Sequence, residues 1–327
     1  MGWFRKNHMP VDGKTVLVTG ASEGMGRSAA QQLAAQGANV IVVARNAERL
    51  AEVVDECKSA AKSPAQRFRY IAADVTVPDY AAGLVAEAVA WNGGRPLDIV
   101  WCIAGVSTPL LWMESSRDVA IGASRHNMDV NFWGAAEMAH AVLRAWLRPD
   151  APAHPGQPRH FVFTSSVVSL FPVVGYAPYT PSKCAVRGLA DTLTQETMLY
   201  EATHPVRIAV VYPGTILSPG LVRENTTKPA ITLHLEKDDP QLTPDAAAAQ
   251  AIRGLQRGDY FVTMSLLGDL MRWASLGGSP RNNWVLDTLG AWMITTAMYF
   301  ILWWFHGEIR GHARKNGHPA TYNKKSA

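Results

Sequence analysis

The sequence of 327 residues has little cysteine and no strong excess of one charge. Its three cysteines, Cys57, Cys102 and Cys184, have no paired spacing. This argues against a disulfide framework or a structural zinc site and favours a reducing compartment. The formal net charge is +4, and no basic cluster or acidic run precedes the C-terminal tail, so nucleic acid is not an expected partner.

Long hydrophobic runs are also scarce, although 48% of the residues are hydrophobic. No apolar segment follows the basic residues of the N-terminus, so a secretory signal peptide is not expected. Residues 290–305 are the exception, because they pass without a charge and include three Trp. A helix over 288–305 would be about 27 Å long, close to the hydrocarbon thickness of a membrane. We expect a membrane-associated helix there; the alternative is an aromatic-rich helix packed on the rest of the chain or on a second subunit.

Short β-rich runs alternate with helical patterns from residue 13 to about residue 211. Each strand candidate is almost continuously hydrophobic, as expected for a strand that is buried on both faces. The expected strands are 14–20, 38–45, 68–75, 97–105, 159–166 and 206–214, and the expected helices are 24–36, 46–60, 77–91, 114–148 and 179–202. This order predicts an α/β fold, a doubly wound parallel sheet (Rossmann fold), with ligands bound beyond the carboxyl ends of the strands.

The pattern changes after the sixth strand. Residues 218–243 show no clear strand and are expected to form a mobile segment. A helix is then expected over 243–258, with Thr243 as its N-cap, Pro244 in its first position and Gly258 after its end.

We place a dinucleotide-binding domain at residues 1–260 and a membrane-associated extension with a polar tail at 261–327. At the start of this extension, the run 260–278 is apolar but contains Asp269 and Arg272. These charges favour a helix that lies in the membrane surface over one that crosses the bilayer.

Three glycines, Gly20, Gly24 and Gly26, lie between the first expected strand and the first expected helix. Glycines there allow a tight turn and a close approach of the backbone to a pyrophosphate, whose charge the helix N-terminus stabilises. The turn is typical of dinucleotide binding, although a plain strand–helix turn is the alternative.

Tyr179 and Lys183 are four residues apart and share one face of an expected helix. Pro181 is tolerated only near a first turn, so this helix is expected to begin near Tyr179. A nearby ammonium favours the phenolate, so we expect Lys183 to lower the pKa of Tyr179 from its usual value near ~10. Such a phenol can transfer protons near neutral pH.

The other polar residues of this group are Ser166, at the end of the fifth strand, and Asn131, in the stretch MDVNFWGA. In this order and spacing, the glycine turn, Asn131, Ser166, Tyr179 and Lys183 together resemble the short-chain dehydrogenase/reductase family. The resemblance covers about residues 13–217 and implies a reductase of carbonyl compounds.

The resemblance also implies a role for each residue. Tyr179 donates a proton to the carbonyl oxygen, and Ser166 hydrogen-bonds that oxygen, with Ser165 the less favoured candidate. Lys183 holds the nicotinamide ribose, and Asn131 orders a water relay behind it. The segment Pro213-Gly214-Thr215 is similar to the one that contacts the carboxamide end of the nicotinamide. The implied cofactor-binding residues are Gly20, Ser22, Glu23, Gly24, Gly26, Arg45, Arg49, Asp74, Tyr179, Lys183, Thr215 and Ile216.

The end of the second strand indicates which dinucleotide is used. An acidic residue there would hold the 2′-hydroxyl of NAD, but this chain has Arg45, with Arg49 one helical turn later. NADPH is therefore the expected cofactor, although two solvated arginines are the alternative and the negative Glu23 weakens the prediction. Asp74 is similar to the family's adenine contact, whereas the stretch 102–105 (CIAG) lacks the family's usual Asn.

Within the family, the stretches 211–220, 223–232 and 279–290 are similar to the fungal reductases of sphingoid-base ketones. This similarity implies a long-chain ketone substrate that enters from the bilayer. The terminal residues 324–327 (KKSA) resemble a dilysine retrieval signal, which indicates the endoplasmic reticulum membrane with the catalytic domain in the cytosol. If domain and tail are both cytosolic, the apolar helix cannot cross the membrane only once.

Two other functions remain open from the sequence. One is a membrane-attached reductase of a steroid, retinoid or fatty-acyl ketone, and the other is a non-catalytic dinucleotide-binding scaffold. Family members commonly form homo-oligomers through the helices that correspond to 114–148 and 179–202, so a homo-oligomer is expected.

Overall fold

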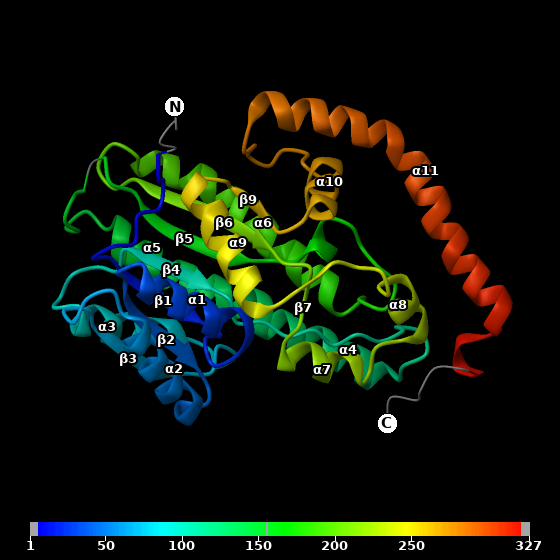
Figure 1. The fold of residues 1–327 in the computed structure, drawn as a ribbon, viewed down its shortest axis with the longest axis horizontal. Coiled ribbons are helices and arrows are strands. Elements are labelled where there is room, and N and C mark those ends of the chain that lie inside the picture. The colour runs from blue at the N-terminus through cyan, green and yellow to red at the C-terminus, as the bar shows by residue number, and fades with distance from the viewer. Residues whose placement is uncertain (1–5, 155, 322–327) are drawn as a thin grey trace.

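The computed structural model describes residues 6–154 and 156–321, so the candidate retrieval signal at 324–327 lies outside the described residues. Seven parallel strands form one sheet in the order β3-β2-β1-β4-β5-β6-β9 (Figure 1). The strands are β1 (Thr15–Thr19), β2 (Asn39–Ala44), β3 (Phe68–Ala72), β4 (Ile99–Cys102), β5 (Arg159–Thr164), β6 (Val206–Tyr212) and β9 (Phe261–Thr263). The predicted doubly wound parallel sheet is confirmed, and its first six strands lie where the hydrophobic runs predicted them.

Helices cover both faces of this sheet. One face carries α1 (Gly24–Ala35), α2 (Ala47–Ala60) and α9 (Pro244–Arg257), and the other carries α3 (Tyr80–Trp91), α5 (Gly134–Leu147) and α6 (Tyr179–Thr197). Each face has its own hydrophobic core, with Val16 and Val18 of β1 on one side and Leu17 on the other. The alternation of side chains along a strand thus explains why the buried strands are hydrophobic at every position.

The helix predicted over 114–148 is three elements in the structure. It consists of α4 (Arg117–Asn127), a π-helical turn (Met128–Trp133) and α5. The π-helical turn contains Asn131. Single π-helical turns inside α-helices are frequent at functional sites. Short 3₁₀ turns occur at Val167–Ser169, Met198–Tyr200 and Pro319–Thr321.

The segment 218–243, predicted without regular structure, contains α7 (Pro219–Asn225), α8 (Ala230–Leu235) and β8 (Gln241–Leu242). The last of these pairs with β7 (Thr215–Ile216) in a small second sheet. A capping signal was present in the sequence, because Ser218 Oγ accepts a hydrogen bond from the Leu221 N–H at 3.3 Å and Pro219 follows as the first helical residue. The predicted helix after this segment is confirmed as α9, with Thr243 as its N-cap and Gly258 as its C-cap.

The single helix predicted over 260–278 is wrong in its first part. Residues 261–263 form β9, a buried strand that pairs with β6, so the sheet continues past the domain boundary placed at residue 260. Only α10 (Leu266–Ala274) is helical in this run. Arg272, read as a charge at the membrane surface, is instead buried and pairs with Asp287 at 2.8 Å.

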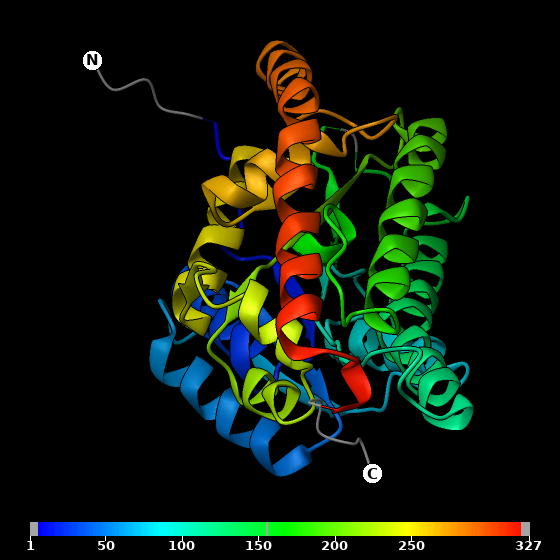
Figure 2. The ribbon, with the colours of Figure 1, turned by 90° about the vertical axis from the view of Figure 1, so that its right-hand side faces the viewer.

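The C-terminal helix α11 (Trp284–Asn316) has 33 residues and is longer than the predicted 288–305. It begins beside α10 and runs along one side of the molecule towards α8 (Figures 1 and 2). Near its end, the Phe305 ring contacts Phe171, with ring centroids 5.2 Å apart. Among the described residues, α11 is the one helix long and apolar enough to cross a membrane, and only 17% of its most apolar window is buried.

Candidate active site

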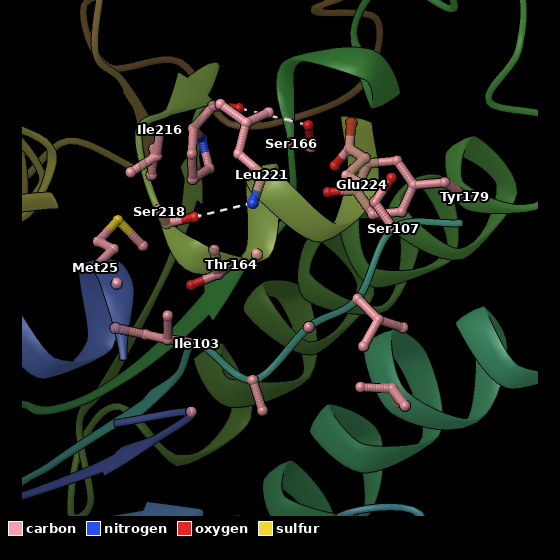
Figure 3. Close-up of a pocket in the computed structure, with 18 of the residues that line it drawn as sticks. Met25, Ile103, Ser107, Thr164, Ser166, Tyr179, Ile216, Ser218, Leu221 and Glu224 are labelled. Atoms are coloured by element: carbon pink, nitrogen blue, oxygen red, sulfur yellow. Dashed lines mark hydrogen bonds between the residues drawn. The ribbon is translucent and has the colours of Figure 1, made fainter. Parts of the chain in front are cut away.

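A cavity of about 830 Å³ lies beyond the carboxyl ends of the central strands. It spans the crevice between β1 and β4, where the strand order reverses, as expected for a doubly wound sheet. All residues predicted for catalysis or cofactor binding line this cavity, except Asn131. Figure 3 shows the part of the cavity around Ser166, Tyr179 and Glu224.

The glycine turn is packed too tightly for larger residues. Gly20 has φ +69°, and a Cβ atom on it would come within 2.6 Å of the Ala104 backbone nitrogen. A Cβ atom on Gly26 would overlap the carbonyl oxygen of Gly20. Helix α1 begins at Gly24, within this glycine motif, and the side chain of its N-cap residue, Glu23, does not cap it. The first N–H groups of α1 are therefore not satisfied by a side-chain cap, which fits the pyrophosphate of a dinucleotide.

Two arginines neutralise the carboxylate of Glu23. Arg49 Nη1 lies 2.9 Å from Glu23 Oε2, and Arg223 of α7 forms a second ion pair with the same carboxylate. The negative charge that weakened the expectation of NADPH is thus compensated within the protein. The pair with Arg223 also connects the glycine turn to the segment 218–243, which forms one wall of the cavity.

Arg45 is the exposed residue after β2, at the entrance to α2. It makes no ion pair with any residue that the structure describes, whereas Arg49 is already paired with Glu23. Asp74 lies close enough that Arg45 contributes to its pKa: burial opposes the charged carboxylate, but hydrogen bonds from Thr76 and the charge of Arg45 hold the Asp74 pKa below its usual range. Of the two predicted arginines, Arg45 is the one available to a 2′-phosphate.

The structure separates the two serines at the end of β5. Ser165 Oγ is buried, donates to the carbonyl oxygen of Lys183 at 2.9 Å and lies 2.9 Å from Ser169 Oγ. Both serines line the cavity, but the Ser166 hydroxyl interacts with the Tyr179 hydroxyl, and its other hydrogen bonds, to the Pro213 carbonyl oxygen and from the Val168 N–H, are long at 3.4 Å. This arrangement favours Ser166, the candidate preferred on sequence, as the hydroxyl available to a substrate.

The pKa of Tyr179 lies above its usual value, so the expectation that Lys183 lowers this pKa below its usual value is wrong for the net shift. Burial raises the pKa of Tyr179, and the Ser166 hydroxyl only partly offsets this change. Lys183 Nζ lies 5.7 Å from the centre of the Tyr179 ring and donates to the Thr164 carbonyl oxygen at 3.0 Å. Desolvation of the phenolate therefore outweighs the attraction of the ammonium. The phenol stays protonated at neutral pH, which is the form that a proton donor needs.

Lys183 is buried, and this burial lowers its pKa to about 8. Asn131 lies near Lys183, because both side chains border Gly105. A Cβ atom on Gly105 would come within 3.1 Å of Asn131 Oδ1 and 3.3 Å of Lys183 Nζ. The Asn131 amide accepts from the Val106 N–H at 2.8 Å and donates to Ser182 Oγ at 2.9 Å. Asn131 is therefore near the ammonium, but its own side chain connects the loop after β4 to helix α6.

A second polar group on the cavity wall was not predicted from the sequence. Lys228 pairs with Glu224 at 3.0 Å and with Glu236 at 2.7 Å, and Tyr176 Oη lies 2.7 Å from an oxygen of each carboxylate, to either of which it can donate its one proton. We call these four residues the Glu224 cluster. Tyr176 adjoins Tyr179, with ring centroids 5.8 Å apart, so the cluster lies beside the predicted proton donor.

The fold agrees with a comparison of the chain to known protein families. The family model described as short chain dehydrogenase matches residues 14–229. The chain belongs to the short-chain dehydrogenase family. As a member, it is an oxidoreductase that uses a nicotinamide dinucleotide.

Two fungal proteins are similar to this chain over almost its whole length. The chain is 57% identical over 99% of its length to 3-ketodihydrosphingosine reductase gsl-3 of Neurospora crassa, of which it covers 90%. It is 38% identical over 98% of its length to 3-ketodihydrosphingosine reductase ksrA of Aspergillus fumigatus, of which it also covers 90%. Both similarities extend beyond the region of the family model.

Solved structures support the same fold. A short-chain dehydrogenase/reductase from Burkholderia phymatum in complex with NAD aligns with a TM-score of 0.63 and 21% identity, over 78% of this chain and 90% of that one. A short-chain type dehydrogenase/reductase from Mycobacterium ulcerans aligns with a TM-score of 0.62 and 25% identity, over the same shares of both chains.

Proposed function

We propose that this dehydrogenase reduces 3-ketodihydrosphingosine to dihydrosphingosine with NADPH, at the endoplasmic reticulum membrane and from its cytosolic side. The similarity to the Neurospora enzyme, 57% over 99% of the chain, carries this proposal. It includes the C-terminal helix, which the family model does not reach. The compartment and the orientation rest on the sequence alone.

The proposed reaction uses the residues around Tyr179. When bound, NADPH supplies the hydride that the carbonyl carbon receives. Tyr179, protonated because it is buried, donates its hydroxyl proton to the carbonyl oxygen. Ser166 hydrogen-bonds this oxygen, and the ammonium of Lys183 stabilises the phenolate that forms. Donors that are already oriented in a buried site lower the barrier because they need no reorganisation.

The walls of the cavity also suit a lipid substrate. Phe171 and Met271 line the cavity on the side of α10 and α11, and Phe171 contacts Phe305 of α11. An alkyl chain extending from Tyr179 towards these residues would leave the protein beside the apolar helix. We propose that the ketone enters from the bilayer along this side.

We expect Arg45→Ala to weaken NADPH binding about 10- to 100-fold and NADH binding less than about 3-fold. A charge-assisted hydrogen bond to a phosphate contributes about 1.5–3 kcal/mol, and NADH has no 2′-phosphate. Titration of each cofactor, followed by fluorescence, measures both changes. Arg69→Ala is the control, because Arg69 is exposed and does not line the cavity. Equal losses for NADPH and NADH would show that Arg45 does not bind the 2′-phosphate.

Activity should fall as the pH rises through about 8. Burial lowers the pKa of Lys183 to about 8, so most of its ammonium is present at pH 7, about half is lost at pH 8, and the rest is lost above pH 8. The raised pKa of Tyr179 keeps the phenol protonated over the same range. The kcat/KM for the ketone should be level from pH 6 to 7.5 and then fall about tenfold per pH unit. A profile still level at pH 9.5 would exclude the ammonium of Lys183 from the reaction.

The assay of detergent-solubilised protein tests the proposed function. We expect 3-ketodihydrosphingosine and NADPH to give dihydrosphingosine, with little turnover of steroid, retinoid or fatty-acyl ketones. Preferential turnover of one of those ketones would support the alternative substrate classes. Protein that binds NADPH but reduces none of these compounds would support the non-catalytic alternative.

A further inference from the structure

The Glu224 cluster brings an unusual set of charges to the substrate end of the cavity. The side chain of Lys228 is only 3% exposed, and those of Glu224 and Glu236 are 17% and 16% exposed. Glu224 lies in α7, Lys228 between α7 and α8, Glu236 directly after α8, and Tyr176 in the loop before α6. All four residues line the cavity.

The cluster has an excess of negative charge. Among the described residues, Lys228 is the one cation within ion-pair distance of Glu224 or Glu236, so one ammonium faces two carboxylates. Asp239 lines the same cavity, and burial raises its pKa to about 6, so it adds negative charge above this pH. Partly buried charge that its neighbours do not balance is costly, and a cation bound in the cavity would offset this cost.

The excess charge lies next to the predicted proton donor. Tyr176 links Glu224 to Tyr179, and the charge of Glu224 contributes to the raised pKa of Tyr179. Glu224, Ser107 and Tyr179 lie together on this part of the wall (Figure 3). Ser107 Oγ is buried and has no hydrogen-bond partner among the described residues, so a polar group is unsatisfied here unless a ligand provides a partner.

We propose that Glu224 binds the ammonium group of an amino ketone substrate and places the neighbouring carbonyl beside Tyr179. This inference rests on the proposed function, because 3-ketodihydrosphingosine carries its amino group on the carbon next to the ketone. Lys228 and Tyr176 hold the Glu224 carboxylate in place, and Ser107 hydrogen-bonds the polar head of the substrate. Glu224 thereby makes the enzyme specific for amino ketones over plain long-chain ketones.

Binding of the substrate ammonium to Glu224 also favours proton transfer from Tyr179. In the protein alone, the negative charge of Glu224 disfavours the phenolate of Tyr179. A substrate ammonium next to Glu224 neutralises that charge at the moment when Tyr179 must give up its proton. An amino ketone thus removes an electrostatic obstacle that a plain ketone leaves in place.

The test compares two substrates in two proteins. Wild type and Glu224→Gln are assayed with 3-ketodihydrosphingosine and with a ketone of the same length that has hydrogen in place of the amino group. We expect Glu224→Gln to lose about 10- to 30-fold in kcat/KM with the amino ketone and less than about 3-fold with the plain ketone. Asp238→Asn is the control, because Asp238 is exposed and does not line the cavity. It should leave kcat/KM unchanged for both ketones.

The outcomes separate this inference from the proposed function. Equal losses for both ketones would overturn the role of Glu224 and leave the reductase assignment intact. Failure of the wild-type enzyme to reduce 3-ketodihydrosphingosine would instead contradict the proposed function itself. NADPH titration and thermal unfolding of Glu224→Gln show whether the variant is folded.

A second measurement needs no variant. Dihydrosphingosine and its N-acetyl derivative share a chain length and differ in the positive charge of the amine. As inhibitors of the wild-type enzyme, we expect the free amine to bind at least about tenfold more tightly than the neutral amide. Equal inhibition by the two compounds would overturn the proposal even if Glu224→Gln did not fold.

Discussion

Replacing Tyr179 with Phe should lower the turnover of the ketone at least ~100-fold and leave NADPH binding within about 3-fold of the wild-type value. The substitution removes the hydroxyl that donates the proton but keeps the ring that packs beside Tyr176 and Lys183. General acid catalysis commonly contributes 10²- to 10⁴-fold, or about 2.7 kcal/mol and more of the barrier. Single-turnover reduction with bound NADPH measures the loss directly at the chemical step.

A matched control is available in the same chain. Tyr260 is buried, donates its hydroxyl to Asp191 at 2.6 Å and does not line the cavity. Tyr260→Phe should reduce stability by about 1 kcal/mol but leave turnover within about 3-fold. Activity of Tyr179→Phe near that of the wild type would exclude Tyr179 as the proton donor and remove the basis of the proposed reaction.

Most of the sheet could be predicted from the sequence because its central strands are buried on both faces; the edge strand β3, expected to be buried in the same way, has mainly exposed residues. A short hydrophobic run that turn residues flank, such as those of β1 and β5, predicts a buried core strand. The three residues of β9 were missed for the opposite reason. They open a longer apolar run that continues into α10, and hydrophobicity alone cannot divide such a run into strand and helix.

The site could be predicted where its residues are neighbours in the sequence. The glycine turn and the pair Tyr179 and Lys183 are local patterns, and the structure brings them to one cavity. The Glu224 cluster has no such pattern, because Tyr176 and Glu236 are 60 residues apart and meet only through the fold. The pKa of Tyr179 was missed because spacing reveals a neighbouring charge but not the desolvation that outweighs it.

The contacts of α11 bear on the question that the sequence left open, whether this helix crosses the membrane or lies along it. Asp287 near its start is buried against Arg272, and Glu308 towards its end lies 3.2 Å from His234 of α8. The helix is thus attached to the rest of the chain at two distant points, to α10 near its start and to α8 towards its end. Trp292, Tyr299 and Trp303, which are 73%, 72% and 70% exposed, lie seven and four residues apart and share one face. This arrangement favours a helix that lies along the bilayer and keeps both its ends on one side.

The substitution of Glu for all three aromatic residues, Trp292, Tyr299 and Trp303, should therefore move the protein from the membrane pellet to the supernatant. Each substitution removes a large apolar side chain, whose burial contributes about 1.5–3 kcal/mol, and adds a negative charge at the membrane surface, so three should shift the partition at least ~100-fold. Sedimentation with liposomes measures this shift, and Leu199→Glu is the control, because Leu199 is equally exposed but lies outside α11. The soluble variant should still reduce a short-chain, water-soluble amino ketone, because none of the three residues lines the cavity. Retention of the triple variant on liposomes would show that another part of the chain binds the membrane, and loss of the short-chain activity would show that α11 shapes the active site itself.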